Sequence, residues 1–234
     1  YGGCKIDIVI ALDVSGSNTP TTCLAANEFV VNLVNALDSE MDGSISGSSG
    51  SNNIQIGLCS WTTNNASICD NGGPGNNVQV SPMTTNASLL SSIASNSLYN
   101  QIIGVNEGGS DFYQCAETMG MQTLNDFANS DLGDRSSSYN YKRYLIIVTD
   151  ASSSGACSVP LACEPDMLNN VWNVGTNNGN PSLDVETIAV VVRSNLGAPP
   201  TGWQQITQCI VQSSDNQYEG NGNTLGDVGI DIAL

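Results

Sequence analysis

Oxygen-bearing side chains follow a strongly apolar stretch near the start of the chain, in the sequence DIVIALDVSGS. Asp13, Ser15 and Ser17 stand at alternate positions, and in locally extended backbone alternate side chains point to the same side. A second apolar stretch, LIIVTD, also ends in an acid, Asp150. If the two stretches are neighbouring strands, their carboxylates meet at one edge and repel each other unless a cation lies between them. Hard oxygen ligands without histidine or cysteine suit Mg²⁺ or Ca²⁺, with Mn²⁺ also compatible, rather than zinc or copper.

A helix cap is the alternative explanation for these residues, because Asp and Ser are favoured at the N-cap position. The next helical pattern begins near Thr21 or Thr22, several residues after Asp13. This separation favours the metal site over the cap.

Apolar runs and helical periodicity alternate along the chain. The first strand is apolar on both alternating sets of positions, which is typical of a strand buried on both faces in a parallel sheet. The alternation predicts an α/β fold with a doubly wound, mostly parallel central sheet and helices on both faces. Residues 1–234 are expected to form a single domain, in which binding sites lie at the carboxyl ends of the strands. Strands are expected at 5–13, 54–61, 78–83 (antiparallel, at an edge), 143–150, 183–192 and 216–221, and helices at 23–38, 87–96, 114–128, 165–176, 202–213 and 224–234.

The charge of the chain is strongly acidic. It has 22 acids and 5 bases, a formal net charge of -17. So few bases do not make a phosphate-binding patch, which argues against nucleic acid and anionic membrane surfaces as partners. No apolar run approaches the length that crosses a membrane, so no membrane insertion is expected. Most of the surface acids are explained by solubility alone.

Histidine is absent from the sequence. Serine–histidine and cysteine–histidine catalysis are therefore excluded, and so is histidine-bound zinc. Ser15 has no usual base to activate it, and a carboxylate alone is a weak general base for a metal-bound water. We therefore expect that the protein is not an enzyme.

Eight cysteines and two glycosylation sequons point to an oxidising, extracellular setting. The cysteine number is even and no CxxC spacing occurs. The tripeptide NAS stands at Asn65 and again at Asn86, and both are glycan acceptors in a secreted eukaryotic protein. The first residues, YGGCKID, do not form a signal peptide, so either such a segment was removed or this is a piece of a longer chain.

The two acid-ended stretches resemble a known family. DIVIALDVSGS is similar to the first strand and the Asp-x-Ser-x-Ser motif of von Willebrand factor type A (vWA) domains, including integrin inserted domains, and LIIVTD looks like the later strand of that family. The resemblance implies a metal-ion-dependent adhesion site at the top of the sheet, where an acidic side chain of a protein partner completes the metal shell. Asp13, Ser15, Ser17 and Asp150 match the motif residue by residue.

The middle loop departs from the family pattern. A threonine after glycine is usual there, whereas EGGSDF places Ser110 at this position with Asp111 beside it. We expect Ser110 to be the ligand, with Asp111 as its substitute. Direct coordination by Asp111 would add a negative charge, and the metal would then hold a partner's carboxylate less well. A simple turn is the alternative for both residues.

The expected topology suggests a disulfide arrangement, although eight cysteines allow many pairings. A bond between Cys23 and Cys115 would brace the metal site. The remaining expected pairs are Cys157 with Cys163, Cys59 with Cys69, and Cys4 with Cys209.

Two functions are compatible with these features. The first is an extracellular adhesion or ligand-binding module that grips a carboxylate of a protein partner through Mg²⁺ or Ca²⁺. The alternative is a structural protomer of an extracellular matrix or filament, a homopolymer in which the metal site is structural or vestigial.

Overall fold

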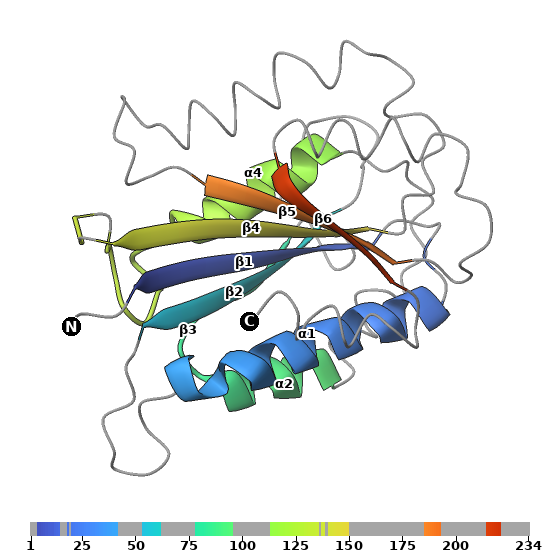
Figure 1. Ribbon diagram of the computed structural model, residues 1–234, viewed down its shortest axis with the longest axis horizontal. Helices are drawn as coiled ribbons and strands as arrows, with labels where there is room; N and C mark the ends of the chain where they lie inside the picture. The colour runs from blue at the N-terminus through green and yellow to red at the C-terminus, as the bar shows by residue number, and fades with distance from the viewer. Residues whose placement is uncertain are drawn as a thin grey trace.

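The computed structural model describes residues 4–14, 18, 20–41, 53–61, 78–95, 113–135, 137–138, 140–149, 185–192 and 214–220. These residues build a six-stranded sheet with the strand order β3-β2-β1-β4-β5-β6 (Figure 1). All neighbouring strands are parallel except β2 and β3, which are antiparallel. The strands are β1 (Lys5–Asp13), β2 (Ile54–Trp61), β3 (Val78–Thr84), β4 (Tyr141–Thr149), β5 (Val185–Val192) and β6 (Ser214–Gly220).

The described helices cover both faces of this sheet. α1 (Pro20–Met41) and α2 (Ala87–Ser95) lie on one face, and α4 (Tyr113–Leu124) lies on the other (Figure 1). The predicted α/β architecture is therefore confirmed, including the antiparallel strand at the sheet edge. The helices expected at 165–176, 202–213 and 224–234 lie outside the described residues.

Three helix ends differ from the sequence prediction by several residues. α1 begins at Pro20 instead of residue 23, because proline suits the first turn of a helix, where its missing N–H is not needed, and it ends at Met41 instead of residue 38. α4 ends at Leu124 instead of residue 128. Beyond it the carboxylate of Asp126 accepts two hydrogen bonds from the side-chain amide of Asn129, both 2.9 Å long, which stabilises a turn.

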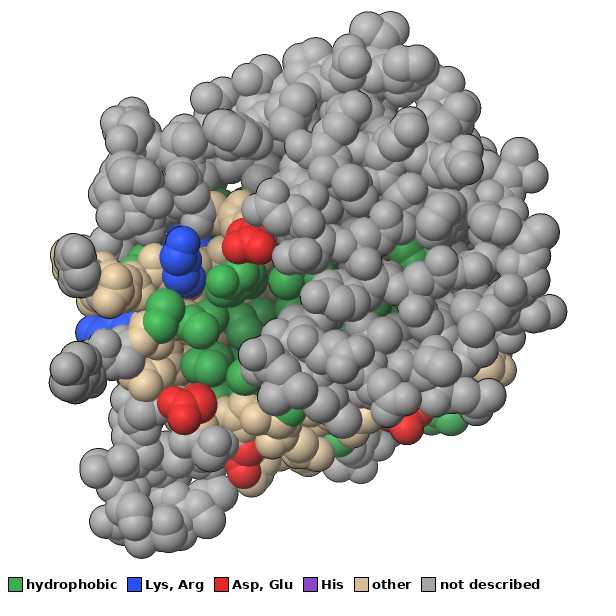
Figure 2. All heavy atoms as spheres, viewed as in Figure 1, with side chains coloured by type: hydrophobic (Ala, Val, Ile, Leu, Met, Phe, Trp, Pro, Cys, Tyr) green, Lys and Arg blue, Asp and Glu red, His purple; other side chains and the backbone are tan. Residues whose placement is uncertain are grey.

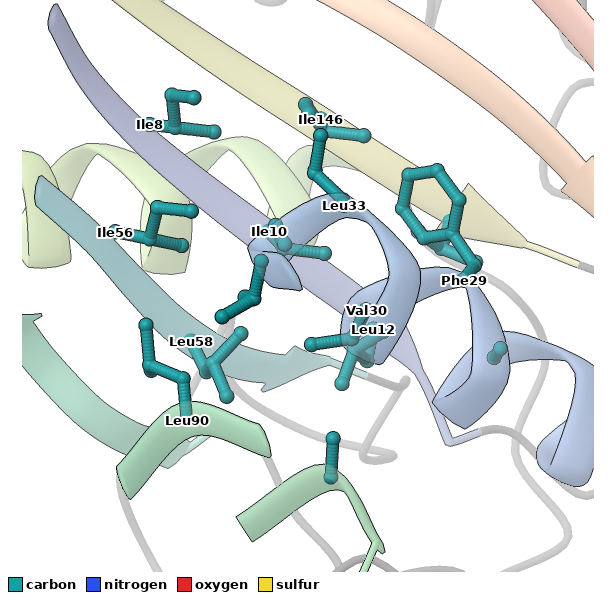
Figure 3. Close-up of a cluster of buried hydrophobic side chains, with 14 of the residues drawn as sticks. Ile8, Ile10, Leu12, Phe29, Val30, Leu33, Ile56, Leu58, Leu90 and Ile146 are labelled. Carbon is teal, nitrogen blue, oxygen red and sulfur yellow. The ribbon is translucent and has the colours of Figure 1, made fainter. Parts of the chain in front are cut away.

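The larger core lies between the sheet and α1. Alternate residues of β1, among them Ile8, Ile10 and Leu12, face this helix and are buried with Phe29 and Leu33 (Figure 3). α2 adds Leu90 to the same cluster. The intervening residues of β1 face α4, so β1 is apolar on both faces, as expected for a central parallel strand.

α4 packs closely on the opposite face because glycines remove side chains at the contact. A Cβ atom added to Gly120 of α4 would lie 2.4 Å from Cδ1 of Leu145. A Cβ atom added to Gly57 of β2 would lie 2.8 Å from Cγ2 of Thr123. The second core cluster, which includes Met119 and the fully buried Trp61, fills the rest of this layer.

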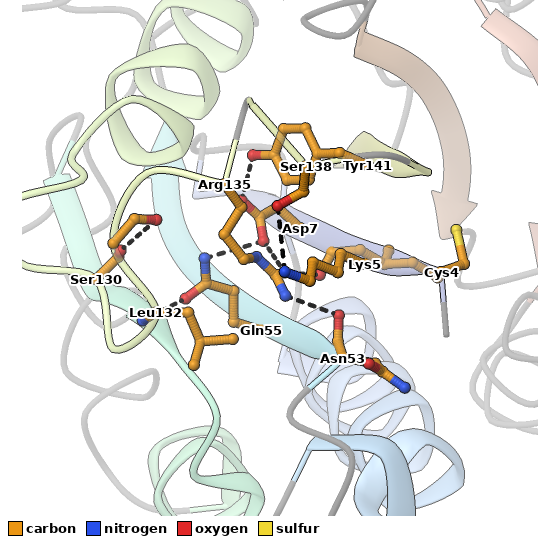
Figure 4. A network of polar contacts seen from close by, with 12 residues as sticks. Cys4, Lys5, Asp7, Asn53, Gln55, Ser130, Leu132, Arg135, Ser138 and Tyr141 are labelled. Carbon is orange, nitrogen blue, oxygen red and sulfur yellow. Dashed lines mark hydrogen bonds and ion pairs between the residues drawn. The ribbon is translucent and has the colours of Figure 1, made fainter. Parts of the chain in front are cut away.

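A buried polar network fastens the connection between α4 and β4 to the amino ends of the strands (Figure 4). Asp7 of β1 is fully buried and forms an ion pair with Arg135, whose side chain is only 5% exposed. The same carboxylate accepts hydrogen bonds from the Tyr141 hydroxyl and, at 2.9 Å, from the side-chain amide of Gln55. Arg135 also donates to the main-chain carbonyls of Ile6 (2.7 Å) and residue 53 (3.0 Å). The network joins β1, β2 and β4 at their amino ends, whereas the metal site is predicted at the carboxyl ends of the strands.

Candidate metal-binding edge

The first and fourth strands of the sheet are neighbours, as the metal-site prediction requires. β1 and β4 run parallel, and Leu12 pairs with Val148. Asp13 therefore ends β1 beside Thr149, the last residue of β4. Chain order also reverses here, because β2 lies on one side of β1 and β4 on the other. Such a switch point at the carboxyl ends of the strands is where open α/β sheets bind ligands.

Asp13 is buried at this edge, with 3% of its surface exposed. The Thr149 hydroxyl donates a 2.8 Å hydrogen bond to Oδ2 of its carboxylate. The side-chain amide of Asn18 donates to its main-chain carbonyl at 3.2 Å. Both the carboxylate and the main chain of Asp13 are thus held in place.

The helix-cap alternative does not fit the observed helix start. α1 begins at Pro20, seven residues after Asp13, so Asp13 does not occupy the N-cap position. Asn18 lies nearer the helix, and its side-chain oxygen accepts a 3.2 Å hydrogen bond from the Thr22 hydroxyl. Asn18 therefore links the main chain of Asp13 to the first turn of α1.

The remaining predicted ligands lie outside the described residues: Ser15, Ser17, Ser110, Asp111 and Asp150. Among the described residues, no three His, Cys, Asp or Glu side chains form a metal-binding group. Of the predicted set, the structure thus locates Asp13, together with the end of the strand that precedes Asp150.

The surroundings of Asp13 suit a hard cation. Asp13 offers carboxylate oxygens at the carboxyl end of β1, and the hydroxyl oxygen of Thr149 lies beside them. Carboxylate and neutral oxygens are the ligands that Mg²⁺ and Ca²⁺ prefer. A cation bound by the oxygens of Asp13 would act there as a Lewis acid toward a further oxygen ligand.

Sequence reasoning missed the positions of Thr149 and Asn18 beside Asp13. Thr149 is within the quoted LIIVTD stretch, but a threonine near a strand end is too common to attract attention. Its relation to Asp13 depends on the pairing of β1 with β4, 136 residues apart in the sequence. The signal that could have found it is the parallel alignment of the two acid-ended strands.

The four expected disulfide bonds stay predictions, because four of the eight cysteines lie outside the described residues. Cys23 belongs to the core cluster under α1 and Cys115 to the cluster under α4, so the sheet lies between the two clusters. Cys59 is fully buried under α4, where burial raises the pKa of its thiol to about 12. Cys4 is exposed at the amino end of β1 and donates a hydrogen bond to the carbonyl of Asn140. The expected partners Cys69, Cys157, Cys163 and Cys209 lie outside the described residues.

One of the two sequons can be located. Asn86 is exposed immediately before α2, and its side-chain oxygen accepts a 2.9 Å hydrogen bond from the main-chain N–H of Leu89. It therefore caps this helix. Asn65 lies outside the described residues.

Basic side chains gather at the end of the molecule opposite Asp13. On the face that Figure 2 shows, the visible Lys and Arg side chains lie near the amino ends of the strands, and the acids are scattered. Lys5 and Lys142 occupy adjacent strands at this end.

Among the described helices, none is long and apolar enough to span a membrane.

Comparison with known proteins gives matches in structure but not in sequence. No family model and no curated protein matches the chain. Proximal thread matrix protein 1 from the mussel byssus is 13% identical, with a TM-score of 0.57 over 98% of this chain and 47% of its own. The pilus adhesin SpaC from Lactobacillus rhamnosus GG is 14% identical, with a TM-score of 0.60 over 100% of this chain and 30% of its own. The chain thus spans less than half of each of these two structures.

A third solved structure corresponds to the chain along almost its whole length. The vWF domain of the type V pili tip protein Mfa5 from Porphyromonas gingivalis is 9% identical, with a TM-score of 0.51 over 98% of this chain and 94% of its own. The chain has a vWA-like fold, which it shares with pilus proteins and a byssus matrix protein.

Proposed function

We propose that this protein is an extracellular adhesion module that binds a divalent cation at the carboxyl ends of β1 and β4 and grips a carboxylate of a protein partner through it. Asp13 would bind the cation, with Ser15, Ser17, Ser110 and Asp150 as further ligands and Asp111 as the substitute for Ser110. The cation, Mg²⁺ or Ca²⁺, would supply an open position for the partner's oxygen.

One observation carries this proposal: Asp13 is buried at the switch point of the sheet, with its carboxylate held beside the end of the strand that leads to Asp150. The sequence between Asp13 and α1 offers hydroxyl oxygens, and the chain contains no histidine that would favour a softer metal. Similar folds in a pilus adhesin and a pilus tip protein support a binding role rather than a catalytic one.

A structural protomer of a matrix or filament is the second candidate. The specific observation that favours it is the similarity to a byssus thread matrix protein. In this case the partner carboxylate would belong to a neighbouring copy of the chain. The net charge of -17 offers many carboxylates for such a contact, and a cation would offset the repulsion between acidic subunits.

The adhesion proposal is tested by binding to immobilised peptides. A short peptide with one aspartate is compared with the same peptide carrying asparagine, each in Mg²⁺ and in chelator. We expect binding to the aspartate peptide that requires the metal and is lost in Asp13→Ala. Binding that survives chelation would contradict the proposed mechanism.

Electron microscopy of the purified protein separates the two candidates. Regular fibres that form with Mg²⁺ and dissolve in chelator would favour the protomer. Monodisperse particles at high protein concentration would favour the adhesion module.

A further inference from the structure

Two uncharged side chains hold Asp13 from different sides. Thr149 is 1% exposed, and its hydroxyl donates to the Asp13 carboxylate at 2.8 Å. Asn18 donates to the Asp13 main-chain carbonyl at 3.2 Å, and its own side-chain oxygen accepts from Thr22 of α1. The first contact limits rotation of the carboxylate, and the second fixes the main chain that carries it.

These contacts come from different parts of the fold. Thr149 ends β4, which is fixed against β1 by parallel pairing over the length of both strands. Asn18 is tied to the first turn of α1, whose buried face packs on the sheet. Asp13 is therefore held by a hydrogen bond from the sheet on one side, and on the other through Asn18, which also contacts helix α1.

We propose that Thr149 and Asn18 are positioning residues for the cation site, which hold the Asp13 carboxylate in the orientation that binds the metal. This inference rests on the proposed function, since it assumes a cation at Asp13. A ligand that is already oriented loses less conformational freedom when the metal binds. Residues that orient metal ligands through hydrogen bonds typically change metal affinity by about 10- to 100-fold when they are removed.

The test measures Mn²⁺ binding to the metal-free chain by titration calorimetry and by the electron paramagnetic resonance signal of bound Mn²⁺. Thr149→Val keeps the shape of the side chain and removes the donor, whereas Thr149→Ser keeps the donor. Thr123→Val is the matched control, because Thr123 is equally buried at 1% exposure but lies on α4. Urea unfolding in chelator reports the stability of each variant without metal.

We expect Thr149→Val to weaken Mn²⁺ binding by about tenfold or more, Thr149→Ser to restore most of it, and Thr123→Val to leave it unchanged. The resonance signal of the Thr149→Val complex should also differ from that of the wild type. If Thr149→Val does not fold, Asn18→Ala provides the test, because Asn18 is only partly buried. It should weaken binding to a similar extent.

The possible results distinguish the positioning role of Thr149 and Asn18 from the proposed cation binding at Asp13. A wild type without a single Mn²⁺ site would overturn both. A wild-type site that Asp13→Ala abolishes, but that Thr149→Val and Asn18→Ala leave unchanged, would overturn the positioning role alone. Equal weakening by Thr149→Val and Thr123→Val would also overturn it, because the effect would then come from the fold in general.

Discussion

Removing Asp7 should destabilise the protein strongly, although Asp7 is remote from the proposed site. Asp7→Ala leaves the Arg135 guanidinium, 5% exposed, without its carboxylate partner. Two main-chain carbonyls would still accept hydrogen bonds from Arg135, but they do not neutralise its charge. Breaking one side of a buried ion pair typically costs about 3–5 kcal/mol. Folded globular proteins have a free energy of unfolding of only about 5–15 kcal/mol, so the variant should lose a large part of its stability.

Urea unfolding followed by circular dichroism gives this free energy. Asp38→Ala is the control, because Asp38 is exposed on α1 and its removal should change stability by less than about 0.5 kcal/mol. The double variant Asp7→Ala/Arg135→Ala should be more stable than the sum of the single losses indicates, since no unpaired charge remains. A loss in Asp7→Ala below about 1 kcal/mol, or strictly additive effects, would refute the view that this ion pair fastens the connection between α4 and β4.

Packing, ionisation and helix capping can each be tested by a single substitution. Gly120→Ala should lower the free energy of unfolding by about 1–3 kcal/mol in urea, because its methyl group would collide with Leu145. Burial, and next the nearby Asp7 charge, raise the pKa of Tyr141 above its usual value, so its stabilising contribution is complete below about pH 10 and is lost as pH rises further. Tyr141→Phe removes the hydrogen bond that the hydroxyl donates to Asp7 and should be about 2 kcal/mol less stable than wild type at pH 7. A difference that stays unchanged above pH 10 would contradict this. On secretion from eukaryotic cells, Ser88→Ala should remove one glycan without loss of stability, whereas Asn86→Ala should also lose the helix cap and about 1 kcal/mol. Mass spectrometry and thermal unfolding check both results.

The strands were predictable because their apolar patterns are strong and local. β1 and β2 have the boundaries that the sequence predicts, and β3 pairs antiparallel at the edge as expected. Helix ends were less predictable, because proline at a helix start and Asn–Asp turns after a helix shift the boundaries by several residues. The acid that ends β1 could be recognised as a ligand candidate from its place after a buried strand.

Contacts between distant residues could not be predicted from these local patterns. Asp7 falls within the run that reads as a buried strand, and its partner Arg135 is 128 residues away in an irregular connection. The same holds for Thr149 and Asp13, which meet only once β4 is placed next to β1. Predicting such pairs requires the strand order of the sheet, which periodicity does not contain.

Calorimetric titration of Mg²⁺ and Ca²⁺ into the chelated protein, beside the Asp13→Ala/Asp150→Ala variant, decides whether the carboxyl ends of β1 and β4 bind a cation. We expect one tight site in the wild type that is absent from the variant. Weak binding at many sites, equal in both proteins, would contradict it, because the acidic surface alone would then explain the metal that is bound.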